Sequence, residues 1–233
     1  MGQEQFGRKA TLLVVRPEQV GNNPSAFVPG STIDLSQMHF RFRTVQQDVE
    51  SPNNCAIRVY NLSRATVEAI SKSEYSRVIL QAGYGDAFGV IFDGTLKQFR
   101  TGRESATTTY LDLLVADGDI AYNYATINKT LAAGSSSADR VDAAVDAMGP
   151  YGVTKGYISL APTGGVLPRG KVLFGMPRVL LRQEAAAAGA TWNISNGQVN
   201  ITPLDGYLPG DAVELNAATG MIGMPEQIGR AHV

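Results

Sequence analysis

The segment from residue 90 to residue 123 constrains the fold more than any other part of the chain. It reads VIFDGTLKQFRTGRESATTTYLDLLVADGDIAYN, which predicts two long β-runs, a polar turn between them and a tight Ala-Asp-Gly-Asp corner. Apolar residues of the second run share one face of the strand: Leu111, Leu113 and Val115. Tyr110 and Asp112 lie on the other, more polar face, and Thr109 is a polar exception to the pattern. A long hairpin with few catalytic residue types predicts a scaffold and not an active site.

Alternating hydrophobicity predicts further strands before this hairpin. The runs cover residues 10–15, 38–43, 57–60 and 77–82. In the clearest of them, apolar and polar residues alternate as in a half-buried strand: Met38, His39, Phe40, Arg41, Phe42 and Arg43. A short helix is predicted at 65–70, with Ser63 as its N-cap. Short strands at this spacing predict a small antiparallel barrel or sandwich.

The pattern changes after Asp119, where two helices are predicted. The first follows a Gly-Ser-Ser-Ser loop at 134–137, and Asp139 lies in its first turn, where a negative charge is favourable. Its apolar stripe has helical spacing and ends before Gly149-Pro150: Val141, Ala144, Val145 and Met148. The second helix begins at Pro177 and ends at Gly189, with one apolar face: Leu181, Ala185 and Ala188.

A β-hairpin is predicted around Asn196-Gly197, the dipeptide that most favours a two-residue turn. This turn places Ile194 opposite Val199 and Trp192 opposite Ile201, with all four side chains on one face. Trp192 is therefore expected to anchor a core or an interface. The alternative, a platform on which a sugar stacks, fits a hairpin position less well.

Composition excludes several classes of partner. The formal net charge is −1, which argues against non-specific nucleic-acid binding, because that requires a basic face. Four arginines would form a local basic patch if they converged: Arg41, Arg43, Arg100 and Arg103. Arginines on strands are more often solvated or ion-paired. Cys55 is the only cysteine, so no internal disulfide forms, and its alternation with Ile57 and Val59 predicts a small buried side chain.

The sequence also predicts where the protein is made. No apolar run is long enough to cross a bilayer, so no membrane anchor is expected. The N-terminal residues MGQEQFGRK are too polar for a signal peptide. We expect synthesis in the cytoplasm, where the protein stays until it joins an assembly.

Residues 165–171, GVLPRGK, have the spacing of a phosphate-binding loop up to the next position. Val172 stands there in place of the serine or threonine that would ligate magnesium. Pro168 also removes one of the backbone N–H groups that such a loop directs at phosphate. The segment is expected to be a surface loop that enters a strand, and no cofactor is predicted.

Catalytic and metal-binding sites have few residues to draw on. The chain has two histidines, of which His39 lies within a predicted strand and His232 at the C-terminal end. Asp117 and Asp119 lack the further oxygen ligands of a calcium loop. They are expected to lie in a turn, where both carboxylates accept local backbone hydrogen bonds. No catalytic, cofactor-binding or metal-binding residue is predicted.

Several short segments, taken in order, resemble the baseplate hub proteins of tailed phages. They are SPNNCAIRVYNLS, EYSRVILQAGYGD, FDGTLKQFRTGRES, ADGDIAYN, LPRGKVLFGMPRVLLR and GYLPGDAVELNAATGMIGMPEQ. The resemblance implies an α+β, β-rich fold. Its first part, residues 1–120, would be an antiparallel β-barrel like that of the tail tube protein. Residues 121–205 would form an α/β module with two helices and a β-hairpin, and residues 206–233 the start of a second barrel.

The same resemblance implies a non-enzymatic structural protein of the virion tail. In that family the hub is a homotrimeric ring that joins the tail tube, or a distal tail protein, to the central spike. The long hairpin would pair with an adjacent subunit and help line the ring, through a polar face that supplies the candidate subunit-interface residues: Lys97, Arg100, Arg103 and Asp112. No nucleic-acid specificity is expected.

The C-terminal residues differ from what the resemblance leads one to expect. In the family, the GMIGMPEQ segment leads into further strands of the second barrel. Here residues 228–233, IGRAHV, follow it, and the same string results when one frame of a common sequencing adapter is translated. We expect a second barrel truncated after a first strand at 212–215, with residues 228–233 non-native and His232 without function.

Two alternative functions remain open from the sequence. A tail-associated lysin would cleave cell walls and would need a deep cleft with two acids, such as Glu68 and Glu74, or a zinc site. Exposed acids of this kind are more often solvated. A free-standing β-rich adaptor would have no place in a virion. Tape-measure and spike genes beside this gene would favour the tail protein over both.

Overall fold

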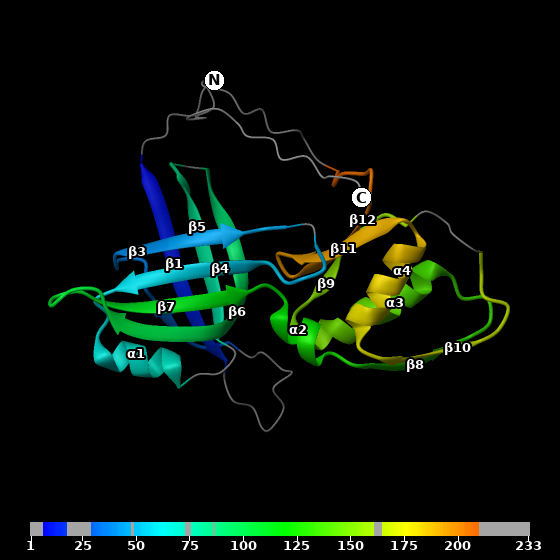
Figure 1. The fold of residues 1–233 in the computed structure, drawn as a ribbon, viewed down its shortest axis with the longest axis horizontal. Coiled ribbons are helices and arrows are strands. Elements are labelled where there is room, and N and C mark those ends of the chain that lie inside the picture. Colours follow the sequence, from blue (N-terminus) through cyan, green and yellow to red (C-terminus); the bar gives the residue numbers. More distant parts are fainter. Residues whose placement is uncertain are drawn as a thin grey trace, which may run out of the picture.

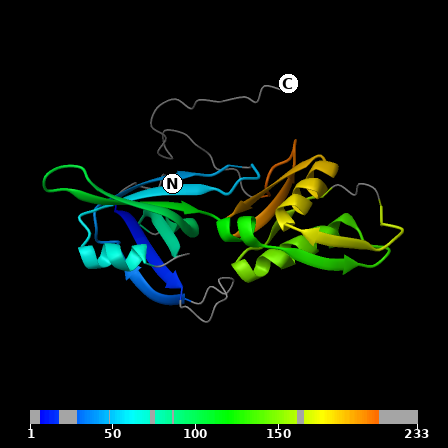
Figure 2. The same ribbon diagram turned by 60° about the horizontal axis from the view of Figure 1, so that its bottom comes forward.

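The computed structural model describes residues 7–17, 29–47, 49–72, 76–85, 87–160 and 165–209. These residues form a β-rich molecule with four α-helices. Figure 1 shows two bodies placed end to end along the longest axis, and Figure 2 shows the same arrangement after rotation. The first body is a sheet with one helix, and the second combines helices with short sheets. The expected C-terminal strand, the rest of residues 210–233 and Glu74 lie outside the described residues.

The first body contains one seven-stranded sheet with the order β2-β1-β5-β6-β7-β4-β3. Every pair of neighbours in it is antiparallel. Its elements are β1 (Arg8–Pro17), β2 (Pro29–Asp34), β3 (Phe40–Val45), β4 (Asn54–Tyr60), α1 (Arg64–Ser71), β5 (Arg77–Tyr84), β6 (Ala87–Arg103) and β7 (Thr109–Ala116). The predicted strands and the helix capped by Ser63 are thus present, and the Ser63 hydroxyl accepts the Thr66 N–H at 3.1 Å.

The long strand β6 folds the sheet over on itself. Its residues 87–95 pair with β5, and its residues 95–103 pair with β7. Gly94 lies at this change of partner, where a Cβ atom would be 2.7 Å from the Ala116 carbonyl oxygen. In Figure 1 the dark-blue β1 therefore crosses behind β3, β4 and β7. The inward faces enclose one core: Leu12, Val14, Leu35, Cys55, Ile57, Val59, Ile70, Val78, Leu80, Phe92, Leu96, Leu111, Leu113 and Val115.

The expected barrel is not closed in the described part of the chain. β2 and β3 are the two edges of the sheet, and no backbone ladder joins them there. The Gln46 amide, just past β3, donates to the Ile91 carbonyl at 3.2 Å, so this hydrogen bond links the end of β3 to β6 and not to β2. Closure needs matched tilt and register around every strand, which an alternating sequence pattern does not specify.

The predicted half-buried strand at 38–43 is only partly correct. β3 begins at Phe40, and Phe42 is 39% exposed although it faces the apolar side. The reason is that β3 is an edge strand, so one flank of its apolar side has no neighbouring strand to cover it. Phe40 and Met38 are partly buried and pack against the core.

The second body contains two small sheets and two principal helices. Its elements are α2 (Asp119–Tyr124), β8 (Ile127–Leu131), α3 (Ser137–Met148), η1 (Gly149–Tyr151), β9 (Thr154–Ile158), β10 (Lys171–Gly175), α4 (Pro177–Ala187), β11 (Ala190–Ser195) and β12 (Gln198–Pro203). β8 and β10 form an antiparallel pair, and β9 joins the β11–β12 hairpin by parallel pairing with β12. Helices α3 and α4 lie side by side in Figures 1 and 2.

The two helices and the hairpin of this body confirm the sequence predictions. Ser136 and Asp139 form a capping box at the start of α3, and the whole predicted stripe is buried. Strand pairing puts Trp192 opposite Ile201 and Ile194 opposite Val199, and Trp192 is 1% exposed. A second core results: Ala121, Ala125, Ile127, Val141, Ala143, Ala144, Val145, Met148, Val153, Leu173, Leu180, Leu181, Ala185, Ala190, Trp192, Ile194, Val199 and Ile201.

A buried polar junction connects the two bodies. The Asn53 side-chain amide donates to the Ile194 backbone carbonyl at 3.2 Å, and the Asn53 backbone carbonyl accepts the Asp117 N–H at 2.9 Å. The Asp117 carboxylate accepts the Gly197 N–H at 3.0 Å. Gly118 has φ +64, and a Cβ there would lie 2.7 Å from the Ile194 side chain. The Ala-Asp-Gly-Asp corner is thus a contact between the bodies, because its glycine permits a close approach.

Candidate interaction surface

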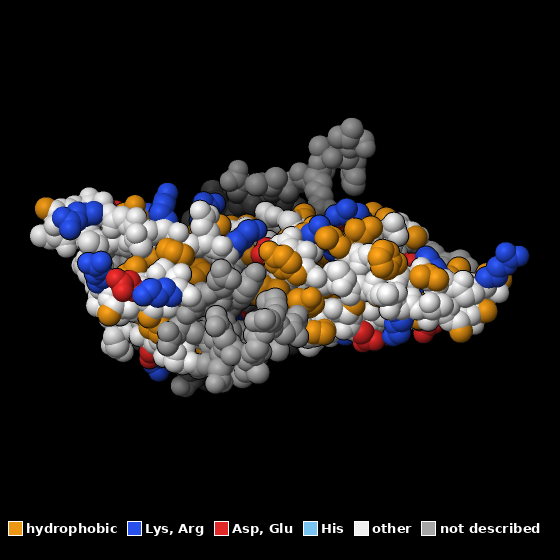
Figure 3. Space-filling model, turned by 90° about the horizontal axis from the view of Figure 1, so that it is seen from below, with side chains coloured by type: hydrophobic (Ala, Val, Ile, Leu, Met, Phe, Trp, Pro, Cys, Tyr) orange, Lys and Arg blue, Asp and Glu red, His pale blue; other side chains and the backbone are white. Residues whose placement is uncertain are grey.

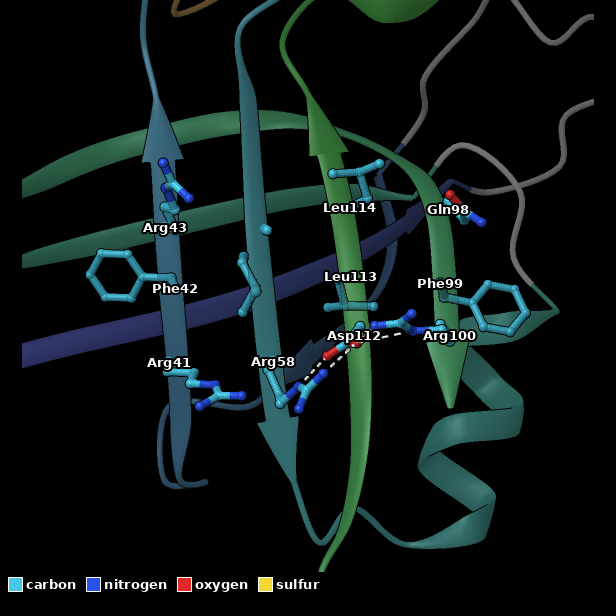
Figure 4. Close-up of a pocket in the computed structure, with 12 residues that line it drawn as sticks. Arg41, Phe42, Arg43, Arg58, Gln98, Phe99, Arg100, Asp112, Leu113 and Leu114 are labelled. Carbon is cyan, nitrogen blue, oxygen red and sulfur yellow. Dashed lines mark hydrogen bonds and ion pairs between the residues drawn. The ribbon is translucent and has the colours of Figure 1, made fainter. Parts of the chain in front are cut away.

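The outer face of the first sheet carries a row of charged residues across four adjacent strands. Strand register places Arg41 of β3 opposite Arg58 of β4, and Arg58 opposite Asp112 of β7. It also places Asp112 opposite Arg100 of β6. Directly paired residues point to the same side of a sheet, so the four side chains share one face, as Figure 4 shows.

Asp112 is the centre of this row. It accepts two hydrogen bonds from Arg58, at 2.5 and 2.8 Å, and one from the Arg100 Nη2 at 2.8 Å. The Arg58 hydrogen bonds are the main cause that holds the pKa of Asp112 below its ordinary value, and Arg100 adds to the effect. The carboxylate therefore stays ionised and fixes both guanidinium groups on the surface.

Two further residues, Tyr110 and Glu104, help to hold the Arg58 side chain in place. Its guanidinium lies 3.9 Å from the centre of the Tyr110 ring, within the range of a cation–π contact. The Tyr110 ring covers Gly102 on the neighbouring strand, where a Cβ atom would be 2.4 Å from the ring. Glu104 lies 3.9 Å from Arg58 and 4.0 Å from Arg41 at one end of the row. Arg58 is consequently well packed, with 19% of its side chain exposed.

A second row, two residues further along each strand, completes the face. Its members are Arg43, Ala56, Leu114 and Gln98. The two rows line a hollow of about 480 Å³. The hollow is lined by four arginines and one acid, Asp112, and small apolar groups lie between them. Phe42 and Phe99 border it, but they share the register row of the buried Ile57 and Leu113, and Figure 4 shows their rings pointing away from the arginines.

The structure places the predicted interface residues in three different locations. Arg100 and Asp112 lie in the charged row, whereas Lys97 sits at a bulge of β6 and pairs with Asp119 at 3.1 Å. Arg103 lines a separate hollow beside α1. Of the arginines that would form a basic patch if they converged, Arg41, Arg43 and Arg100 do converge, but Arg103 does not.

Sequence reasoning missed Arg58, which joins the two halves of the row. A signal was present, because Arg58 alternates with the buried Ile57 and Val59 and so had to face outward. Its partner Asp112 was recognised, but the pairing of β4 with β7 is a long-range contact that alternation does not predict.

The chemical motifs weighed from sequence have structural roles. The loop at 165–170 leads into β10, as expected, and Leu167 exchanges backbone hydrogen bonds with Gly134 and Ser135. The prediction that Asp117 and Asp119 accept local backbone bonds is wrong, since they contact Gly197 and Lys97 far along the chain. His39 precedes β3 and stacks on Tyr60. In the described ranges, no group of three His, Cys, Asp or Glu side chains is placed to hold a metal ion.

No helix among the described residues is both long and apolar enough to pass through a membrane. No protein-family model matches the sequence, and no curated protein matches it. Solved structures do match. The 43 kDa tail protein of prophage MuSo2 from Shewanella oneidensis aligns with 84% of this chain at 10% identity and a TM-score of 0.54. The tail protein from Neisseria meningitidis MC58 aligns with 84% at 12% identity and a TM-score of 0.53.

The chain has the fold of these two tail proteins. The similarity expected from the sequence segments is thereby confirmed at the level of the fold. The chain spans about half the length of these two tail proteins, 53% and 51%. Sequence identity this low shows a shared fold but not a shared function. The role of the chain must therefore also be inferred from its surfaces.

Proposed function

We propose that the protein is a structural component of a phage or prophage tail, and that its place is the baseplate hub. The observation that carries the proposal is the similarity of 84% of the chain to two tail proteins, one of them from a prophage. In this role the protein contacts the tail tube or a distal tail protein on one side and the central spike on the other. It would reside in the virion tail after synthesis in the host cytoplasm.

The proposed organisation has a sheet domain in residues 1–120, an α/β module in 121–205 and a further barrel that begins at 206. Two separate sets of buried side chains, one in each of the first two parts, support this division. The proposed assembly of the full-length protein is a homotrimeric ring. A trimer with two similar barrels per chain would present six similar surfaces to a sixfold tube and three to a spike.

The free edge of β6 supports a subunit contact through the long hairpin. Residues 97–103 pair with β7 on one side and have no strand on the other side within the described chain. Such an edge exposes unpaired N–H and C=O groups, which a neighbouring strand satisfies. Arg100 and Arg103 lie on this segment, so reversing their charges should impair subunit contact.

Native mass spectrometry tests the proposed ring. A full-length homologue should give a trimer, and Arg100→Glu/Arg103→Glu should reduce the trimer fraction while circular dichroism stays unchanged. The matched control, Lys129→Glu/Arg169→Glu, makes the same change in charge on exposed residues of the second body and should leave the trimer intact. A monomer at high concentration would contradict the ring, and a normal trimer in the hairpin variant would contradict the contact.

The proposed role is non-catalytic. The lysin alternative predicts release of soluble fragments from purified cell walls, and the adaptor alternative predicts no association with particles. Antibodies against the protein, applied to particles from an induced host, should label one end of the tail. Cell-wall release by the purified protein, or protein found only outside the particles, would overturn the proposal.

A further inference from the structure

Three arginines of the outer hollow have guanidinium N–H donors that the neighbouring side chains do not fully accept. Arg41 and Arg100 have 60% and 69% of their side chains exposed. Arg43 is exposed and has no ion-pair partner among the described residues. Asp112 is already occupied by Arg58 and Arg100, and Glu104 lies at the far limit of a contact with Arg41. The lining therefore carries more positive charge than it neutralises internally.

We propose that this hollow binds an extended, acidic polypeptide segment of a partner protein. Arg41 and Arg43 are two residues apart on one strand face, which puts them roughly 7 Å apart. Acidic side chains at every second position of an extended peptide have the same roughly 7 Å spacing. Such a peptide, lying along β3, presents one carboxylate to each arginine, and its carboxylates accept charge-assisted hydrogen bonds.

Arg100, on the far side of the hollow, is too far from β3 to pair with a peptide that lies along that strand, but it adds to the positive charge of the hollow. Arg100 lies three strand spacings from Arg41, roughly 14 Å across the sheet. Between them Ala56 and Leu114 provide an apolar floor on which the small side chains of a peptide can rest. The internal Asp112–Arg58 pair shows the kind of group that this surface accepts, a carboxylate held by a guanidinium fork.

The arrangement favours protein carboxylates over single-stranded nucleic acid. Proteins that bind single strands combine a basic groove with aromatic rings on which bases stack. The rings that border this hollow, Phe42 and Phe99, turn away from it in Figure 4. Tyr110 is occupied by Arg58 on its face. The hollow thus has the charge for phosphate but offers no free ring to a base.

Fluorescence anisotropy with three labelled probes tests the proposal on the full chain. The probes are an eight-residue peptide with glutamate at every second position, the same peptide with glutamine in those positions, and an eight-nucleotide oligothymidylate. The acidic peptide should bind, more weakly as salt rises. Arg41→Gln/Arg43→Gln should weaken its binding by at least about tenfold, because two charged forks are lost. Arg41→Lys/Arg43→Lys should recover part of the loss.

The control variant Lys129→Gln/Arg169→Gln removes two exposed charges elsewhere and should leave the affinity within about twofold. The proposal is overturned if the acidic peptide does not bind at low salt, or if the control variant loses as much affinity as the β3 variant. It is also overturned if the glutamine peptide or the oligothymidylate binds as tightly as the acidic peptide. These outcomes are independent of the proposed tail role, because the substitutions are in β3 and not at the hairpin edge. The measurement also does not require assembly into a trimeric ring.

Discussion

Asp117 is a buried carboxylic acid in the junction between the two bodies. It is 4% exposed and accepts the Gly197 N–H. Burial raises the pKa of Asp117 from 3.8 to about 6; hydrogen bonds from the Gly197 and Asn196 backbone oppose this rise, and the charge of Asp93 adds to it. The folded protein thus holds a proton on this group where the unfolded chain has released it.

The sign of the effect on stability follows from that difference. Between pH 4 and pH 6 the folded state binds more protons than the unfolded state, so the free energy of unfolding falls as pH rises. Asp117→Asn keeps the oxygen acceptor and cannot ionise. We expect the variant to gain on the wild type by on the order of 1–3 kcal/mol between pH 4 and pH 7. Urea unfolding of both proteins at each pH measures the difference, and a constant difference would contradict the prediction.

Among the elements, α3 shows how much local sequence supports a helix end. The Ser136 hydroxyl accepts the Asp139 N–H at 3.2 Å, and the Asp139 carboxylate accepts the Ser136 N–H at 2.7 Å. Ser136→Ala should lower the free energy of unfolding by about 1 kcal/mol. Because the two side chains form one motif, Ser136→Ala/Asp139→Ala should cost less than the two single variants together. Denaturant titrations of the three variants decide this, and strictly additive losses would count against a coupled cap.

Strand β10 exposes large apolar side chains to solvent. Phe174 is 84% exposed and Val172 is 65% exposed, and Met176 and Val179 continue the apolar surface onto α4. Figure 3 shows apolar side chains gathered on the half of the molecule that contains the second body. Surfaces of this kind promote association.

Phe174→Ser should therefore reduce self-association without a cost in stability. The side chain makes few contacts, so the melting temperature should change by no more than about 2 °C. Light scattering at increasing protein concentration should show less aggregate than in the wild type. Leu173→Ser is the contrasting variant, because Leu173 is 3% exposed and its replacement should destabilise the second core. Equal scattering by Phe174→Ser and wild type would show that this surface does not drive association.

At the scale of the whole molecule, the two cores lead to a prediction about cooperativity. Trp192 is the only tryptophan and lies in the second core, so its fluorescence reports that core alone. Leu113→Ala in the first core and Leu181→Ala in the second should each cost about 2–5 kcal/mol. If the cores unfold separately, Leu113→Ala should shift the circular dichroism of the sheet and leave the tryptophan midpoint in place. Leu181→Ala should shift the tryptophan midpoint. Coincident shifts of both signals in both variants would mean one cooperative unit.

Much of the secondary structure was predictable from residue patterns, for a local reason. The stripe of α3, its cap, the start of α4 at Pro177 and the Asn196-Gly197 turn each depend on residues close together in the chain. The same is true of the buried face of β7, where alternation alone selects Leu111, Leu113 and Val115. The sequence predicts two of the four residues of the charged row, Arg100 and Asp112, because the same alternation puts their side chains on the polar face of the hairpin.

Other features could be decided only when distant segments paired. Alternation shows which side of a strand is buried, but not that β4 lies between β3 and β7, and so it could not join Arg41 and Arg58 to Asp112. It could not show that β2 and β3 remain edges and leave the barrel open, nor that β3 would expose Phe42. Asp117 looks like an ordinary turn residue until the β11–β12 turn covers it. In each case the free energy comes from contacts between residues far apart in the chain, which local propensity does not contain.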